Sequence, residues 1–537
     1  MTDWTIGSLA EAIKTRKLSP VEAVRGYLDR IEKLNPNLRA FITVNAEGAL
    51  ARARALEKEP PRGPLHGVPL AYKDLCAVKG LLTSCGTRTP DYFLSAHECT
   101  AVTRLSQAGA VTLGKLNMSE LAMGPFGDNA HHGDAQNPWR AGHITGGSSS
   151  GSGGAVAARL CAGALGSDTG GSIRLPAAAC GIIGLKPTYG RVSRAGAMPL
   201  SWSYDHLGPM TLTSRDCALL LGVIAGHDPA DATSSRRGVP DYVAALAAPV
   251  SGVRVGVPEN YYFDGLHREV DRAVREAIAV LGGLGARVEA LRLPDPRPMV
   301  AACNNMMVGA EAAAIHSRIL KERPGELQPS VLARLAPGLR VSAYDYIQGS
   351  RLRARLTREF IADVFSKVDV LVAPSIPEPA PALAEAKSGT TEDVVKRMGR
   401  FSRLTRPINA LGLPALSVPC GFSSDGLPIG LQIIGRPFDE ALLLRLGHAY
   451  EHSTNWPTRR PPAPVIPSPR RGGEGRVRGP LIGEEAKGKG ETVQRSATAS
   501  PESPTAAYPP APPAAHCRTR SGTPWSSSPT SAPPSAA

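Results

Sequence analysis

Two glycine–glycine–serine corners lie close together in this 537-residue chain and carry its clearest chemical signal. The first corner ends at Ser148 and the second at Ser172, and a segment of small residues joins them. Paired glycines allow a sharp turn and leave backbone N–H groups open to a ligand. A serine at the end of such a turn can present its hydroxyl beside those donors, as acyl transfer requires. The pattern therefore predicts a hydrolase that uses two serines.

Lys73 is the candidate base for these hydroxyls. It follows an apolar, strand-like segment in the run GPLHGVPLAYKDL and directly precedes Asp74. A lysine that apolar neighbours desolvate loses its proton more readily and can then accept one from a hydroxyl. Because a single lysine at a strand end is more often structural, Lys73 gains this meaning only in combination with the two serine corners.

The elements that must hold these residues alternate along the chain. Ser19, Pro20 and Glu22 form a capping-box pattern that starts an amphipathic helix. Further helices are expected over residues 269–284 and 342–365. Short apolar runs predict strands at residues 110–113, 253–257, 368–373, 415–419 and 429–434. This alternation favours an α/β fold: a single large domain whose central, mostly mixed and twisted β-sheet is covered by α-helices on both faces.

Composition describes a globular protein over most of the chain. Of all residues, 42% are hydrophobic and 20% are charged, and no uncharged apolar run approaches membrane-spanning length. The N-terminus lacks the pattern of a signal peptide, so we expect a cytoplasmic protein with no membrane partner. The nine cysteines are scattered without a C-x-x-C pair, which favours reduced, buried thiols over disulfides or a zinc site.

The composition changes after Trp456. From there the chain is rich in Pro, Ser, Ala, Gly and Arg and loses its apolar periodicity. Such a segment buries too little surface to offset the entropy of ordering it. We therefore expect a folded domain over residues 1–456 and a disordered tail over residues 457–537.

The chemical motifs stand in an order that resembles the amidase signature family. The resemblance runs from SPVEAVRGYLDRIEKLNP through GPLHGVPLAYKDL and GAVTLGKLNMSELAMG to the core GGSSSGSGGAVAARL and GALGSDTGGSIRLPAAACGIIGLKPTYGRVSR. DHLGPMT, GLPALSVPCGF and GLPIGLQIIGRPFDE follow, so roughly residues 5 to 456 are covered. A signature of this length is far more specific than a short motif. It implies an amidohydrolase that acts on linear amide carbon–nitrogen bonds.

The resemblance assigns a role to each member of a Ser–Ser–Lys triad. Ser172 matches the family nucleophile, and Ser148 matches the bridging serine, whose preceding peptide bond is cis in the family. Lys73 matches the lysine that acts, through Ser148, as the general base. Asp168 and Arg174 flank the nucleophile and are expected to orient its loop. The oxyanion hole would be formed by the backbone N–H groups of Thr169, Gly170, Gly171 and Ser172.

Two other motifs offer alternative interpretations. Residues 147–151 fit the G-x-S-x-G nucleophile elbow, which would make Ser149 the nucleophile. The preceding NPWRAGHIT is loop-like rather than a strand, so we expect a structural hydrogen-bonding role for Ser149. His448 and His452 share one helical face, but the sequence offers them no clear third ligand and no metal site is expected.

The identity of the amide is less well defined. The same family contains stand-alone amidases and the glutaminase (A) subunit of the tRNA-dependent amidotransferase. In FSRLTRPIN, Ser402 stands where that subunit carries an aspartate for the amino group of glutamine. A neutral hydroxyl cannot form the ion pair that a zwitterionic substrate requires. We therefore favour a stand-alone amidase, and the alternative is the glutaminase subunit. A catalytically inactive binding module is disfavoured because the whole triad is present.

These interpretations also define the expected partners. A stand-alone amidase takes a small-molecule amide and needs neither cofactor nor metal, and a homodimer is compatible with it. The net charge of +14 raises the question of nucleic acid, but no basic helix or basic–aromatic stripe concentrates that charge. Nucleic acid is therefore expected as a partner only if the chain belongs to an amidotransferase.

Overall fold

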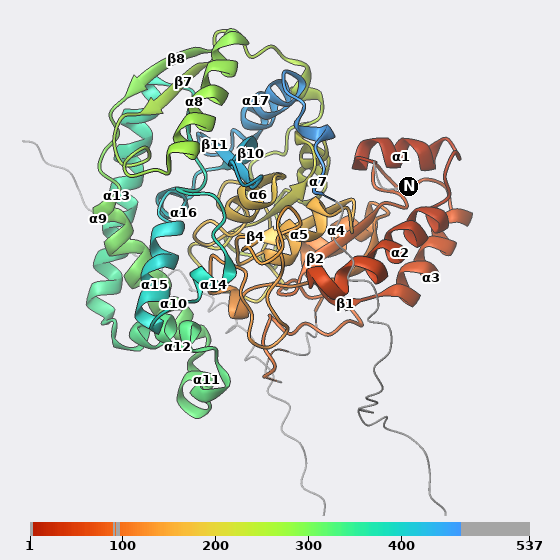
Figure 1. The fold of residues 1–537 in the computed structure, drawn as a ribbon, viewed down its shortest axis with the longest axis horizontal. Helices are drawn as coiled ribbons and strands as arrows, with labels where there is room; N and C mark the ends of the chain where they lie inside the picture. The colour runs from red at the N-terminus through yellow and green to blue at the C-terminus, as the bar shows by residue number, and fades with distance from the viewer. Residues whose placement is uncertain (1–3, 90–91, 93–96, 463–537) are drawn as a thin grey trace, which may run out of the picture. The chain divides into compact units, whose positions relative to one another are not determined.

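A computed structural model of the chain describes residues 4–89, 92 and 97–462, and an eleven-stranded β-sheet forms its centre (Figure 1). The strands are β1 Phe41–Val44, β2 Pro69–Lys73, β3 Val111–Leu116, β4 Gly163–Ser167, β5 Ile183–Lys186, β6 Leu207–Thr211, β7 Arg254–Pro258, β8 Arg287–Leu291, β9 Val370–Pro374, β10 Ala415–Phe422 and β11 Pro428–Gly435. Their order across the sheet is β1-β3-β2-β4-β6-β5-β10-β11-β9-β7-β8. Since β2 runs parallel to β3 and β4 while β4 runs antiparallel to β6, the sheet is mixed, as predicted.

Helices and short helical turns connect these strands. The α-helices are α1 Ile6–Lys14, α2 Pro20–Leu38, α3 Ala46–Lys58, α4 Thr100–Gln107, α5 Ser150–Ala157, α6 Arg174–Cys180, α7 Ser214–Ile224, α8 Arg268–Gly283, α9 Arg297–Met299, α10 Val308–Ile315, α11 Ser317–Glu322, α12 Pro329–Leu335, α13 Ala343–Lys367, α14 Leu383–Ala386, α15 Thr391–Phe401, α16 Arg406–Leu411 and α17 Glu440–His452. η4 Val300–Met307 is a π-helix, and the short 3-10 turns are η2 Glu120–Ala122, η3 Ala244–Ala247, η5 Pro324–Glu326, η6 Ala336–Arg340 and η7 Trp456–Thr458. The predicted helices are present as α2, α8 and α13, and the predicted strands as β3, β7, β9, β10 and β11.

The first predicted helix begins where its capping box places it. Ser19 Oγ accepts a hydrogen bond from the Glu22 N–H at 3.0 Å, and the Glu22 carboxylate accepts one from the Ser19 N–H at 2.8 Å. Pro20 occupies the first helical position, where its missing N–H costs nothing. Local chemistry alone therefore explains the start of α2.

Helices cover both faces of the sheet. A Cβ added to Gly430 on β11 would lie 2.5 Å from Ala178 of α6, whereas one added to Gly435 on the same strand would lie 2.3 Å from Leu443 of α17. Successive side chains alternate between the two faces of a strand, so positions 430 and 435 point to opposite faces. α6 and α17 therefore cover opposite faces, and every residue of β11 between them is buried.

The parallel neighbours β2 and β4 bring the predicted motifs to one edge of the sheet. Lys73 is the last residue of β2, and Ser167 is the last residue of β4. Since the carboxyl ends of parallel strands meet at the same edge, these two side chains become neighbours. The glycine- and serine-rich run folds as the loop containing Ser148, then α5, β4, a corner over residues 168–173, and α6. Both serine corners therefore precede a helix on the same side of the sheet.

Two predictions from composition concern the described residues directly. Seven cysteines there are free and buried, as predicted: Cys76, Cys85, Cys99, Cys161, Cys180, Cys217 and Cys420. Within residues 4–462, excluding the short undescribed gaps, no helix combines the length and the apolar character needed to cross a bilayer.

The described chain extends slightly past the predicted domain boundary. The turn η7 spans that boundary, and the Trp456 ring lies 5.0 Å from the ring of Phe422 between centroids. Of the predicted tail, residues 463–537 lie outside the described residues.

Candidate active site

Lys73 and Ser148 form the polar centre of the site. Both side chains are fully buried, and Lys73 Nζ lies 2.6 Å from Ser148 Oγ and 2.8 Å from Ser167 Oγ. Burial lowers the pKa of Lys73 to about 7, because desolvation penalises its ammonium form. At neutral pH a large fraction of Lys73 is therefore uncharged and able to accept a proton from Ser148.

Ser148 and Ser149 are adjacent but make different contacts. The Gly147–Ser148 peptide bond is cis, as the family resemblance implied. Ser149 Oγ donates to the Ser167 carbonyl and accepts from the Ser167 N–H, each at 3.2 Å. A bend rather than a strand precedes Ser149, so the strand–turn–helix context of a nucleophile elbow is not formed. These contacts agree with the structural role expected for Ser149.

The second corner, residues 168–173, requires glycine at its centre. Gly171 has a φ of +132°, and a Cβ there would lie 2.2 Å from Thr405 Oγ1. The Gly171 N–H donates to Asp168 Oδ1 at 2.7 Å, so this donor is already occupied. We therefore revise the predicted oxyanion hole to exclude Gly171. The corner's N–H groups that have no acceptor within the described chain are those of Thr169, Gly170 and Ser172.

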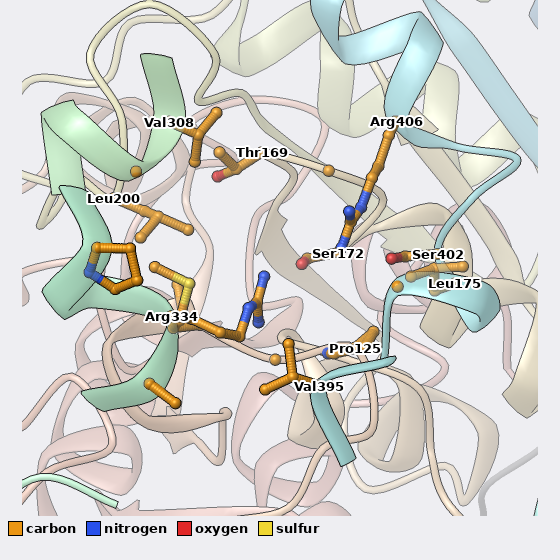
Figure 2. A pocket seen from close by; sticks show the side chains of 18 residues that line it. Pro125, Thr169, Ser172, Leu175, Leu200, Val308, Arg334, Val395, Ser402 and Arg406 are labelled. Atoms are coloured by element: carbon orange, nitrogen blue, oxygen red, sulfur yellow. The ribbon is translucent and has the colours of Figure 1, made fainter. Parts of the chain in front are cut away.

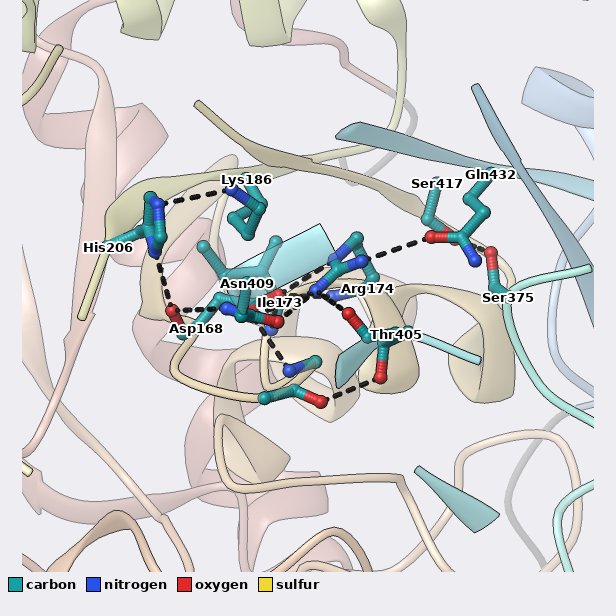
Figure 3. Close-up of polar contacts among 12 residues, drawn as sticks. Asp168, Ile173, Arg174, Lys186, His206, Ser375, Thr405, Asn409, Ser417 and Gln432 are labelled. Atoms are coloured by element: carbon teal, nitrogen blue, oxygen red, sulfur yellow. Dashed lines mark hydrogen bonds and ion pairs between the residues drawn. The ribbon is translucent and has the colours of Figure 1, made fainter. Parts of the chain in front are cut away.

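A buried ion pair supports this corner (Figure 3). Asp168 and Arg174 are fully buried, and Arg174 Nε lies 3.1 Å from Asp168 Oδ2. Burial alone would raise the pKa of Asp168, but the charge and hydrogen bonds of Arg174 outweigh it and lower that pKa. Arg174 also donates to Gln432 Oε1 at 3.0 Å, and Asn409 Nδ2 donates to Asp168 Oδ1 at 2.7 Å. These contacts support the predicted role of the pair in orienting the loop of Ser172.

Lys186 and His206 extend this network and were not singled out from the sequence. His206 Nδ1 lies 3.0 Å from the Asp168 carbonyl oxygen, and Lys186 Nζ lies 3.1 Å from His206 Nε2 (Figure 3). Burial, and then the charge of Lys186, hold the pKa of His206 well below its ordinary value, so this ring is neutral at neutral pH. Both residues belong to matched motifs, KPTYGRVSR and DHLGPMT, but nothing in the motifs indicates that they meet.

Replacing Arg174 tests whether the buried pair supports the corner. Arg174→Met is expected to lower the free energy of unfolding by about 3–5 kcal/mol, because Asp168 would remain charged and buried without its cation. Urea unfolding at pH 7 measures this loss. The matched control is Arg400→Gln, which removes an exposed pair with Glu378 and is expected to cost at most about 1 kcal/mol. Equal losses in the two variants would contradict the supporting role.

Ser172 faces a cavity of about 290 Å³ (Figure 2). Thr169 and Gly170 line it beside Ser172, and the other walls come from the chain after η2 and from α10, α12, α15 and the start of α16. The first serine corner lies against the start of α6, which directly follows the second corner, since a Cβ added to Gly146 would lie 2.9 Å from the Leu175 carbonyl. Among the described residues, no hydrogen bond joins Ser148 to Ser172. The structure thus joins Lys73 to Ser148 by a direct hydrogen bond. The proton transfer between Ser148 and Ser172 stays a prediction.

The two helical histidines lie together on α17. The His448 and His452 ring centroids are 4.1 Å apart, and His452 Nδ1 lies 2.8 Å from the His448 carbonyl oxygen. Across the described part of the chain, no three His, Cys, Asp or Glu side chains come together as a metal ion would require.

Comparison with known proteins relates the chain to one family. Residues 22–444 match the model of the Amidase family. The A subunit of glutamyl-tRNA(Gln) amidotransferase from Roseiflexus sp. (strain RS-1) is 42% identical over 487 residues, covering 86% of this chain and 98% of that protein. The solved native peptide amidase from Stenotrophomonas maltophilia is 32% identical with a TM-score of 0.74, covering 86% of this chain and 98% of its own. A 6-aminohexanoate cyclic dimer hydrolase is 28% identical with a TM-score of 0.79, covering 86% and 99%.

Proposed function

The chain belongs to the Amidase family and is an amidohydrolase acting on amide carbon–nitrogen bonds; from this premise we propose that it is a stand-alone amidase that forms an acyl-enzyme on Ser172. The observation that carries the proposal is the buried hydrogen bond of 2.6 Å between Lys73 Nζ and Ser148 Oγ. A lysine with a pKa of about 7 can act as a general base at neutral pH, because a large fraction of it is then uncharged. Its other contact, Ser167, directly precedes the corner that contains Ser172.

In the proposed acylation, Ser172 Oγ attacks the carbonyl carbon of the amide. Its proton passes to Ser148 while Ser148 passes its own proton to neutral Lys73. The N–H groups of Thr169, Gly170 and Ser172 donate to the developing oxyanion, and each such donor is worth roughly 2.7–4 kcal/mol of transition-state stabilisation. When the tetrahedral intermediate collapses, the proton returns through Ser148 to the leaving nitrogen and the C–N bond breaks. The acyl group remains as an ester on Ser172.

In the proposed deacylation, water takes the place of the leaving amine. Lys73 accepts a proton from the attacking water through Ser148, and a second tetrahedral intermediate forms. As the ester C–O bond breaks, that proton returns to Ser172 Oγ and the carboxylic acid leaves. The cycle restores every residue to its starting protonation state and consumes one water for each amide bond.

Trapping the acyl-enzyme tests this proposal. We expect acid quenching during turnover of a panel of amides to leave the acyl group of each accepted substrate on the peptide that contains Ser172. Mass spectrometry identifies both the modified residue and the preferred acyl group. An acyl group found on Ser148 or Ser149 instead would contradict the assignment of the nucleophile.

The alternative function is that of the glutaminase subunit of a tRNA-dependent amidotransferase. The 42% identity to such a protein over 98% of its length favours it. Against it, Ser402 lines the cavity, and its hydroxyl donates to the Met398 carbonyl at 2.8 Å. This position therefore lacks a carboxylate for the ammonium group of glutamine. The stand-alone amidase, working in the cytoplasm on a small amide and compatible with a homodimer, remains our proposal.

Activity of the purified chain separates the two functions. We expect the chain alone to release ammonia from simple primary amides, with no added protein or tRNA, because the cavity and the proposed relay come from one polypeptide. A coupled ammonia assay measures this release. Ammonia release from glutamine that begins only when the other amidotransferase components are added would favour the alternative.

A further inference from the structure

Two arginines enter the cavity that Ser172 faces (Figure 2). Arg334 comes from α12 and Arg406 is the first residue of α16. Figure 2 shows their guanidinium groups approaching the space beside Ser172 from different walls. The sequence analysis assigned no role to either arginine, although Arg406 lies in the segment FSRLTRPIN that it used for Ser402, and the proposed acyl transfer uses neither.

Neither arginine is paired directly with a carboxylate of the described chain, although the charge of Asp128 acts on Arg334. Within the described residues, neither Arg334 nor Arg406 has an ion pair, and Arg334 Nη1 is buried without a hydrogen-bond acceptor. Asp128, the carboxylate that acts electrostatically on Arg334, accepts instead from Gln328 Nε2 at 2.5 Å. Burial lowers the pKa of Arg334 to about 9, so it stays charged at neutral pH. Because a desolvated cation without a hydrogen-bonded counter-charge is unfavourable, these groups favour a bound anion.

The rest of the cavity wall offers no acidic side chain to a substrate cation among the described residues. Among the described residues that line it, none is Asp or Glu. Ser402, which also lines the cavity, donates its proton to the Met398 carbonyl, and its neutral hydroxyl supplies no negative charge to pair with an ammonium group. The two arginines would also repel an ammonium group, because charges interact more strongly in a buried cavity than in water. The wall therefore discriminates by charge, favouring negative and disfavouring positive substrates.

Arg406 is held next to the reacting atoms. Thr405 Oγ1 donates to the Gly170 carbonyl at 2.7 Å, which ties the start of α16 to the serine corner. A Cβ added to Gly170 would lie 3.7 Å from Arg406 Cγ, so the arginine stem lies against the corner. The cavity volume of about 290 Å³ is at the lower end of the range of small-ligand sites. A short acyl chain would therefore place its far end within reach of an arginine.

We propose that Arg334 and Arg406 form a carboxylate-binding pair that selects amides carrying a carboxylate and no ammonium group, such as the half-amides of short dicarboxylic acids. This inference rests on the proposed function, since it names the substrate class of the same site. Guanidinium groups bind carboxylates through short, charge-assisted hydrogen bonds that supply both affinity and orientation. The pair would hold the far end of the acyl chain while Ser172 attacks its amide carbon.

Three matched amides test the selection by charge. Glutaramate carries the carboxylate, pentanamide replaces it with a methyl group, and glutamine adds an α-ammonium group to glutaramate. We expect kcat/KM for glutaramate to exceed that of either other amide by about 10- to 100-fold. A kcat/KM for pentanamide or glutamine equal to or above that of glutaramate would overturn the inference.

Variants assign the selection to the two arginines. Arg334→Gln and Arg406→Gln are each expected to lower the glutaramate-to-pentanamide ratio of kcat/KM by about 10-fold or more. Arg334→Lys and Arg406→Lys keep the positive charge, so they are expected to keep part of the preference for glutaramate over pentanamide. This result would show that the Gln variants lose the preference through the lost charge and not through a damaged fold. The matched control, Arg400→Gln, removes a cation from the exposed side of α15 and is expected to keep the wild-type ratio. An unchanged ratio in both Gln variants would overturn the assignment.

A binding measurement separates this inference from the proposed function. Glutarate is expected to raise the melting temperature of the wild-type chain and of Arg400→Gln, and to do so less in Arg334→Gln and Arg406→Gln. No stabilisation of the wild-type chain by millimolar glutarate would overturn the carboxylate site. If glutarate stabilised the chain but none of the three amides acylated Ser172, the proposed function would fail while the carboxylate site stood.

Discussion

Ser172→Ala is expected to lower kcat for amide hydrolysis by about 10⁴- to 10⁶-fold, because it removes the oxygen that forms the acyl-enzyme. The neighbouring hydroxyls are committed elsewhere. Ser148 is held by Lys73 at 2.6 Å, and Ser149 exchanges hydrogen bonds with the backbone of Ser167. A small residual rate would come from substrate binding and the oxyanion donors. Ammonia release and the loss of the acylated peptide both measure the effect.

Ser149→Ala is the matched control for this experiment. We expect it to keep kcat near the wild-type value and to lower the free energy of unfolding by about 1–3 kcal/mol, since the Ser167 N–H would lose its acceptor. Unchanged turnover in Ser172→Ala would contradict the proposed mechanism. Loss of turnover in Ser149→Ala alone would support the nucleophile elbow instead.

Lys73→Met is expected to lower kcat by about 10²- to 10⁴-fold, which is the usual contribution of a general base. Methionine keeps the apolar stem in its buried site but cannot accept a proton from Ser148. Steady-state ammonia release, together with a melting temperature that shows an intact fold, measures the effect. A kcat within the wild-type range would contradict the role of Lys73 as base.

The pH profile of activity tests the role of Lys73 without replacing Lys73 itself. Because the neutral form of Lys73 is the active one and its pKa is about 7, kcat/KM is expected to rise by about tenfold per pH unit below that value and to level off above it. Ser167→Ala removes the other oxygen that contacts Lys73 Nζ, so it destabilises the ammonium form and is expected to move the midpoint to lower pH. A profile that is flat from pH 5 to 9 would contradict this titration.

The secondary structure was largely predictable because its causes are local. The start of α2 follows from Ser19 and Glu22, three residues apart, whose hydrogen bonds form within one helical turn. Strands such as β9 and β11 follow from short apolar runs that a sheet covered on both faces requires. The strand order was not predictable, since it depends on pairings between segments far apart in the chain.

The candidate site was predictable in its chemistry and not in its surroundings. The two serine corners and Lys73 indicated the chemistry, and the family resemblance implied that Lys73, Ser148 and Ser172 act together. The structure then added the short contact between Lys73 and Ser148 and the occupied N–H of Gly171, which the family resemblance had placed among the oxyanion donors. A backbone donor is free or occupied according to the folded geometry of its whole corner, which residue types alone do not specify.

The sequence by itself thus determined most of the elements and the groups that we propose to react, because both follow from short, local patterns. Only the tertiary structure decided what surrounds Ser172. Arg334 and Arg406 lie in separate helices, α12 and α16, and no motif marks either as a ligand. They become a pair because helices distant in the sequence pack around one cavity. The charge that a substrate meets there is a property of that packing, and no single segment of the chain contains it.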